Sequence, residues 1–175
     1  MSPIRSAGDT LDAYRTTSVS VQQSQSDVRD LLRARKATGM QISESWLEED
    51  AVADVRFGMP GEAGGFYAYR IRVRVPKLDP EAHRVRINQT RATRLPTAAE
   101  LSSKRAQGER QIWRLVFWWL KAQFEAADAG LVSLEEAFLP WMELPDGRTT
   151  YEAMVQTGGL AKIASGTVPQ LTSGS

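Results

Sequence analysis

The chain of 175 residues contains no cysteine and a single histidine, His83. The absence of cysteine excludes disulfide bonds and thiolate metal sites, and it is typical of proteins from a reducing cytosol. One histidine cannot supply the paired imidazoles of a zinc-peptidase motif. We therefore expect a cytoplasmic protein that carries no metal and no cofactor.

Long hydrophobic runs are missing as well. No stretch of about 18 apolar residues occurs, so the sequence predicts no membrane-spanning helix and no membrane partner. The N-terminal residues MSPIRSAGDTLDAY lack the apolar core of a secretory signal. With 42% hydrophobic and 25% charged residues, the composition is that of a folded globular domain.

Catalytic motifs are also scarce. There is no G-x-S-x-G nucleophile motif. Residues 61–65 resemble a phosphate-binding loop only in their glycines, because no Gly-Lys-Ser/Thr sequence follows them and the next predicted element is a strand. The acidic cluster 48–50 reads as a solvated turn, and Glu135 and Glu136 fit the first turn of a helix. A Mg²⁺ site is the remaining alternative, using Glu125, Glu136 or Asp146. The sequence therefore favours a protein that is not an enzyme and has no catalytic residue.

Positive charge is concentrated in the middle of the chain. Residues 70–110 contain 11 Lys and Arg against 4 Asp and Glu, a net +7, whereas residues 1–69 and 111–175 each carry a net −3. The whole chain is nearly neutral, at +1. Such a distribution predicts a local basic patch with weak long-range attraction for polyanions. Exposed arginine-rich strands also occur as solvated faces or as protected sheet edges.

Residues 66–76, FYAYRIRVRVP, are the source of that patch. Because side chains alternate along a strand, one face is predicted to carry Tyr67, Tyr69, Ile71, Val73 and Val75. The other face carries Arg70, Arg72 and Arg74, spaced about 6.6 Å apart at about 3.3 Å per residue. A buried aromatic face backed by a row of arginines standing free in water suits an extended anionic partner.

The segment 76–96 is predicted to be a basic loop, with one short strand in HRVRI. A long loop in a compact domain is either functional or disordered, and a basic loop beside a basic strand favours a binding role. The candidate nucleic-acid-binding residues are Arg70, Arg72, Arg74, Lys77, Arg84, Arg86, Arg91 and Arg94.

The fold is predicted to be α+β: a small antiparallel sheet packed against one long Trp-rich helix and a shorter N-terminal helix. The long helix runs from Ala98 to about Ala129, with a break expected near Gly108, and its centre is apolar almost all round. Trp118 or Trp119 is the candidate for stacking on a base or anchoring a protein partner, although a core helix with a charged, solvated edge is the simpler interpretation. The sheet is expected from strands at 40–48, 51–60 and 66–76.

Smaller elements complete the prediction. Residues 16–21 favour a strand, and residues 22–39 favour a helix that begins at Ser24 or Ser26 and ends at Gly39. Short helices are expected after Ser133, with Glu136 in a capping box, and after Thr149 or Thr150. The domain is predicted to span residues 14–157, between a disordered tail at 1–13 and a loose tail at 158–175.

The segments TTSVSVQQSQSDVRDLL, ERQIWRLVFWWLKAQFEAADAG and LEEAFLPWMELPDGRTTYE occur in an order that resembles a group of small uncharacterised proteins of tailed bacteriophages and prophages. The matching positions cover about half of the chain; they are Ser24-Gln25, Trp113-Arg114, Lys121-Ala122, Glu125, Phe138-Leu139 and Leu144 to Thr149. That family carries no assigned activity. The resemblance implies a phage context, and hence the host cytoplasm.

Three function classes follow. The first is a non-enzymatic nucleic-acid-binding accessory protein of phage replication, recombination or expression, with DNA favoured over RNA and phosphate contacts made by the arginines. The second is a protein-binding modulator or inhibitor of a host or defence complex, which would use the Trp-rich helix. The third is a structural or assembly protein that forms a homo-oligomer.

Overall fold

The computed structural model describes residues 14, 16–45, 51–61, 64–75, 78–81, 83–87 and 92–165. The helices are α2 (Val21–Ala34), α3 (Ala98–Asp128), α4 (Leu134–Phe138), the 3₁₀ helix η1 (Leu139–Trp141), α5 (Thr150–Gln156) and α6 (Gly159–Ser165). The strands are β1 (Gly39–Ser45), β2 (Ala51–Pro60), β3 (Phe66–Val75), β4 (Val85–Arg86) and β5 (Thr93–Arg94). The predicted α+β architecture is confirmed.

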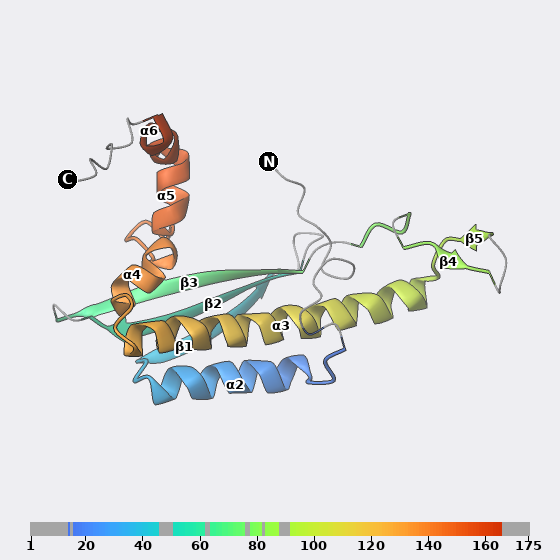
Figure 1. Ribbon diagram of the computed structural model, residues 1–175, viewed down its shortest axis with the longest axis horizontal. Coiled ribbons are helices and arrows are strands. Elements are labelled where there is room, and N and C mark those ends of the chain that lie inside the picture. Colours follow the sequence, from blue (N-terminus) through green and yellow to red (C-terminus); the bar gives the residue numbers. More distant parts are fainter. Residues whose placement is uncertain are drawn as a thin grey trace, which may run out of the picture.

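Strands β1, β2 and β3 form an antiparallel meander in that order, and α2 and α3 lie side by side across one of its faces (Figure 1). The alternation of apolar and polar residues sets this arrangement. Rows such as Ile42–Val55–Ile71 point towards the helices, whereas the neighbouring row Gln41–Arg56–Arg70 points away from them. The short hairpin β4–β5 lies beyond the sheet, near the beginning of α3.

The core is built around an aromatic cluster that joins the sheet to the helices. Phe138, from the short helix α4, is fully buried, and its ring centroid lies 5.2 Å from that of Phe124 and 5.4 Å from that of Tyr69. Phe57 and Trp119 complete the ring contacts of Phe138, at 5.8 and 5.9 Å. One side chain from a five-residue helix therefore fixes the point where the C-terminal segment leaves the body of the protein.

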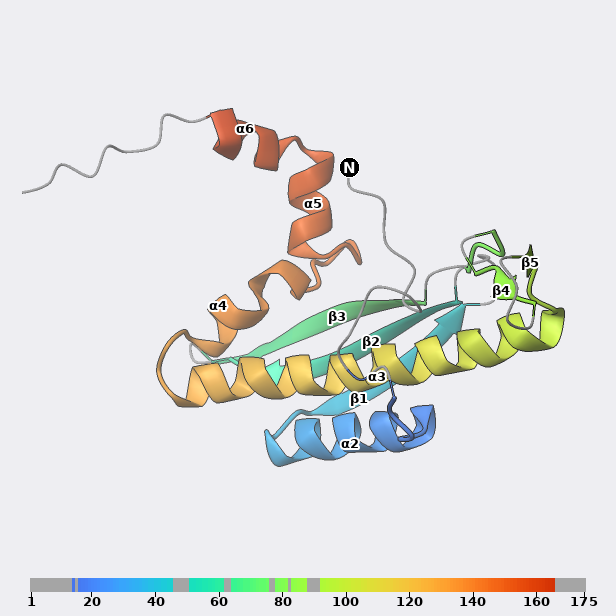
Figure 2. The ribbon, with the colours of Figure 1, turned by 45° about the vertical axis from the view of Figure 1, so that its right-hand side comes forward.

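Helices α5 and α6 form an arm that projects away from the sheet and the long helices, as Figures 1 and 2 both show. The base of the arm is held by the isolated bridges Tyr69–Met142 and Glu143–Thr149. Residues 159–165 were expected to belong to a loose tail, but they form α6. Gly158 adopts a left-handed conformation with φ 69°, which ends α5. The next residues, GLAKIAS, form the new helix α6.

Two predictions near the N-terminus are wrong. Residues 17–20 form no strand; Ser20 caps α2 by accepting a hydrogen bond from the backbone N–H of Gln23 at 3.0 Å. This cap outweighs the β-propensity of TTSVSV and takes the role predicted for Ser24 or Ser26. At the other end, Lys36 occupies the left-handed position with φ 63°, and Gly39 begins β1.

Helix α3 follows the prediction closely but without a break. It is continuous through Gly108, which is buried, and it begins at a capping box between Thr97 and Glu100. Among the described residues, none of the helices combines the length and the apolar character that a bilayer crossing requires. The predicted tail 1–13, the turn 48–50 and residues 166–175 lie outside the described residues.

Candidate functional site: the arginine face and its groove

Strand β3 has the predicted two faces. Tyr69, Ile71 and Val73 are buried against the helices, whereas Arg72 and Arg74 are exposed on the opposite face. We refer to the face that carries Arg70, Arg72 and Arg74 as the arginine face. Arg56 and Asp54 of β2 lie on it too, because they pair in register with Arg70 and Arg72.

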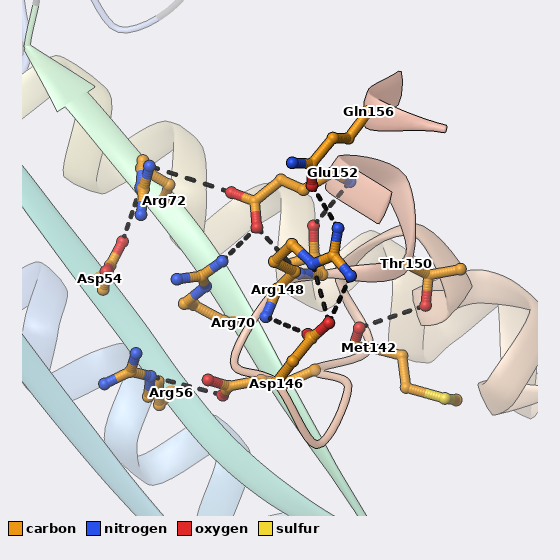
Figure 3. Close-up of polar contacts among 12 residues, drawn as sticks. Asp54, Arg56, Arg70, Arg72, Met142, Asp146, Arg148, Thr150, Glu152 and Gln156 are labelled. Carbon is orange, nitrogen blue, oxygen red and sulfur yellow. Dashed lines mark hydrogen bonds and ion pairs between the residues drawn. The ribbon is translucent and has the colours of Figure 1, made fainter. Parts of the chain in front are cut away.

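Arg70 is not free in water. Only 9% of the residue is exposed, and its guanidinium forms an ion pair with Glu152 of α5 (Figure 3). The position of Glu152 follows from a local rule: it is the third residue of a helix capped by Thr149. The carboxylate accepts a hydrogen bond from the Thr149 N–H at 2.8 Å, and the Thr149 hydroxyl accepts one from the Glu152 N–H at 3.2 Å. The carboxylate of Glu152 therefore has two roles: it caps α5 and it neutralises Arg70.

Arg72 is neutralised from two sides. Its Nε lies 3.1 Å from Asp54 on the neighbouring strand, and its Nη1 lies 3.9 Å from Glu152. Nearby, Arg56 pairs with Glu143 at 3.4 Å. The prediction of a row of three free guanidinium groups is therefore wrong for Arg70 and Arg72, because acidic residues from other elements reach the same face. Nucleic-acid binding by this row stays a prediction.

Arg74 differs from its two neighbours. It is exposed, and no ion pair joins it to any residue of the described ranges. It is one wall of a groove of about 540 Å³ between β3, η1 and α5. The groove is lined by Arg70, Arg72, Arg74, Pro140, Trp141, Thr149, Tyr151 and Glu152. Arginine guanidinium groups thus lie beside aromatic and proline rings in one recess.

The other predicted basic residues do not join this groove into one patch. Arg84 pairs with Glu81 at 2.9 Å, and Arg94 is held by both carboxylate oxygens of Glu100 at 2.8 Å. The hydrogen bonds from Arg94 and from the Thr97 N–H lower the pKa of Glu100 to about 2. Arg86 is exposed on β4, and no ion pair to it is found within the described ranges. Lys77 and Arg91 lie outside the described residues.

The two candidate tryptophans have different environments. Trp118 is 38% exposed, but Lys121 and Arg114 lie over its ring at 5.0 and 5.3 Å, so cations of the protein itself already occupy it. Trp119 packs inward, with its ring 4.6 Å from that of Trp141 and 5.9 Å from that of Phe138. Of the two, Trp118 is the more exposed side chain.

The carboxylates considered for Mg²⁺ have other contacts. Glu125 pairs with Lys121 at 3.6 Å, Glu136 accepts the N–H of its cap residue Ser133 at 2.8 Å, and Asp146 pairs with Arg148. These contacts lower the pKa of Glu136 and of Asp146. In the part of the chain that the structure describes, no group of three histidine or acidic side chains is arranged to hold a metal ion.

Sequence reasoning missed Glu152, Trp141 and Tyr151, which complete the groove. The only available signal was the spacing Thr149-x-x-Glu152, which is typical of a capping box. That pattern identifies the cap, but it does not reveal that the same carboxylate contacts an arginine 82 residues earlier in the chain. No family of proteins, no curated protein and no solved structure was found to match this chain.

Proposed function

We propose that the protein is a non-enzymatic binding module whose partner is another protein. The groove beside β3 carries this proposal, because its arginines are largely neutralised by the protein's own acids while Trp141 and Tyr151 remain beside them. Tyrosine, tryptophan and arginine in a partly desolvated recess are the residues that dominate the affinity of protein interfaces.

The charge balance argues against a nucleic-acid groove at this face. Affinity for nucleic acid depends on how many phosphates the protein neutralises. Among the described residues of the arginine face, Arg56, Arg70, Arg72 and Arg74 stand against Asp54, Glu143 and Glu152, a net charge of +1. A polyanion would have to displace Glu152 from a nearly buried Arg70, and this would leave a carboxylate without its partner.

The C-terminal arm supplies a second, apolar feature. Tyr151 is 54% exposed and Ile163 is 66% exposed, and both belong to helices that project from the body of the protein (Figure 2). Val155 and Leu160 of the same arm are exposed as well. Adjacent exposed apolar side chains favour a protein contact over a solvated surface.

The phage resemblance gives this proposal its context: the partner would be a component of a host or defence complex. A nucleic-acid-binding accessory role is the second candidate, favoured by Arg74 and Arg86, which are exposed and lack an acidic partner within the described residues. A homo-oligomeric assembly role is separated from both by light scattering of the isolated protein.

The test combines an oligonucleotide titration with capture of a partner. We expect no shift of short DNA or RNA at about 200 mM salt, and only weak binding at about 50 mM. The tagged full-length protein should retain one stoichiometric protein from a lysate of its natural host, and Tyr151→Asp should abolish retention. Arg29→Glu on α2 is the control, since Arg29 is exposed on the opposite side of the sheet. Steeply salt-dependent oligonucleotide binding that is lost in Arg74→Ala would overturn the proposal.

A further inference from the structure

Among the described strands, β3 lies at one edge of its sheet, and part of its outer side is already used for pairing. The N–H of Glu143 donates to the carbonyl oxygen of Ala68 at 2.7 Å, next to the bridge between Tyr69 and Met142. The main-chain groups of Ala68 therefore point away from β2. Because every second residue of a strand points its N–H and C=O to the same side, those of Arg70, Arg72 and Arg74 face the outer side too.

Met142 and Glu143 pair with β3 like the start of a fourth strand, but this pairing is short. Met142 and Glu143 lie along β3, but the preceding residues Leu139–Trp141 turn into the 3₁₀ helix η1. Pro140 in that helix has no N–H to donate to a neighbouring strand. Beyond Tyr69, no described strand pairs with the outer side of β3. The groove opens at the point where this pairing stops.

The side chains of the groove define what fits there. Three arginines line it against one glutamate, and Arg74 has no acidic partner within the described ranges. Trp141 and Tyr151 supply apolar walls on the same face. On the other face of β3, Ile71 and Val73 belong to the core. A strand laid beside β3 would thus meet Arg74, whose charge no described acid compensates, on one face and β-branched side chains on the other.

We propose that an extended acidic segment of a partner protein adds to β3 as a further strand between Arg70 and Val75. Its acidic side chains lie on the arginine face and pair with Arg74, and its alternate residues are β-branched, next to Ile71 and Val73. Main-chain hydrogen bonds give the affinity, and the alternation of acidic and apolar residues gives the specificity. This inference rests on the proposed function and names the chemistry of the partner.

The probe is a short fluorescent peptide that alternates glutamate and valine, titrated against the full-length protein by anisotropy. We expect saturable binding that weakens at least about tenfold in Arg74→Glu and is unchanged in Arg29→Glu. The same peptide with N-methylated alternate residues keeps its charge but cannot pair along one edge, so it should not bind. Slower hydrogen exchange of the Arg74 amide on peptide binding is the second readout, because that N–H faces the groove.

The outcomes separate this inference from the proposed function. No binding up to about 1 mM peptide, or equal binding of the N-methylated peptide, overturns strand addition. If a captured protein partner is then still lost in Tyr151→Asp, the protein-binding function stands without it. If the groove binds a short oligonucleotide in competition with the peptide, both fail. A far-ultraviolet circular dichroism spectrum of each variant confirms that the fold is intact.

Discussion

Tyr69 sits at the centre of the core, and its hydroxyl has no hydrogen-bond partner in the described part of the chain. Burial raises its pKa to about 12, with further contributions from Glu135 and Tyr67. In Tyr69→Phe the unsatisfied hydroxyl is gone and the ring contacts with Phe57 and Phe138 remain. We expect the free energy of unfolding at neutral pH to stay the same or to rise by up to about 1 kcal/mol, as measured in guanidinium chloride.

The raised pKa of Tyr69 predicts that the folded protein loses stability at alkaline pH. The unfolded chain releases the Tyr69 proton near pH 10, whereas the folded protein keeps it to about pH 12. The free energy of unfolding of the wild type should therefore fall through this window, by about 1 kcal/mol at about pH 11 relative to Tyr69→Phe. Tyr151→Phe on α5 is the control, because Tyr151 is an exposed tyrosine outside the core. A parallel decline in wild type and Tyr69→Phe would contradict the prediction.

Arg94, a predicted nucleic-acid-binding residue, is paired with Glu100 of the protein itself. Both carboxylate oxygens of Glu100 bind Arg94, and the pKa of Glu100 falls to about 2. The Arg94–Glu100 contact thus stabilises the start of α3 above the ordinary carboxylate pKa and is lost as the pH falls towards about 2. In Arg94→Ala, carboxyl NMR should find the Glu100 pKa shifted back towards 4.5. An unchanged midpoint would mean that Thr97 alone lowers it.

Among the elements, the end of helix α2 is the clearest departure from local preference. Lys36 adopts φ 63°, a conformation that favours glycine, while its N–H donates to the Arg33 carbonyl at 3.0 Å. Lys36→Gly should raise the free energy of unfolding by up to about 1 kcal/mol, because the left-handed backbone is no longer strained. Lys36→Ala keeps the strain and removes the charge, so it should gain nothing. Equal effects of the two substitutions would assign the gain to charge.

Elements that are specified by side chains close together in sequence could be predicted. Strands β2 and β3 follow from alternation, α3 from its cap and its apolar centre, and α4 from the Ser133–Glu136 box. The start of α2 could not be predicted, because the β-branched run 16–21 favours a strand whereas the Ser20 cap fixes the beginning of the helix. Neither could the direction of the C-terminal arm, which depends on the packing of Phe138 in the core.

At the scale of the whole molecule, the uneven charge of the sequence does not become an equally uneven surface. The basic middle of the chain, net +7, folds against acidic residues from the flanking segments, each net −3. Asp54 comes from the N-terminal segment, and Glu143 and Glu152 from the C-terminal segment. Such contacts between residues far apart in sequence explain why the arginine row was predicted correctly as a face and wrongly as a free cationic surface.

Glu152 is the residue whose charge decides the character of that face. Glu152→Gln keeps an oxygen for the Thr149 N–H but leaves the nearly buried Arg70 without a counter-charge, so the free energy of unfolding should fall by about 2 kcal/mol. With the charges of Arg70 and Arg72 less compensated, binding of single-stranded oligonucleotides at about 50 mM salt should strengthen at least about tenfold. The slope of log affinity against log salt should steepen by about 0.7 for each phosphate gained, hence by about 0.7 to 1.4 for one or two phosphates. Glu125→Gln, which removes the counter-charge of the half-buried Lys121 on α3, is the matched control and should change neither quantity. If Glu152→Gln binds oligonucleotides no better than the wild type, the protein's own acids are not what keeps the arginine face from binding nucleic acid.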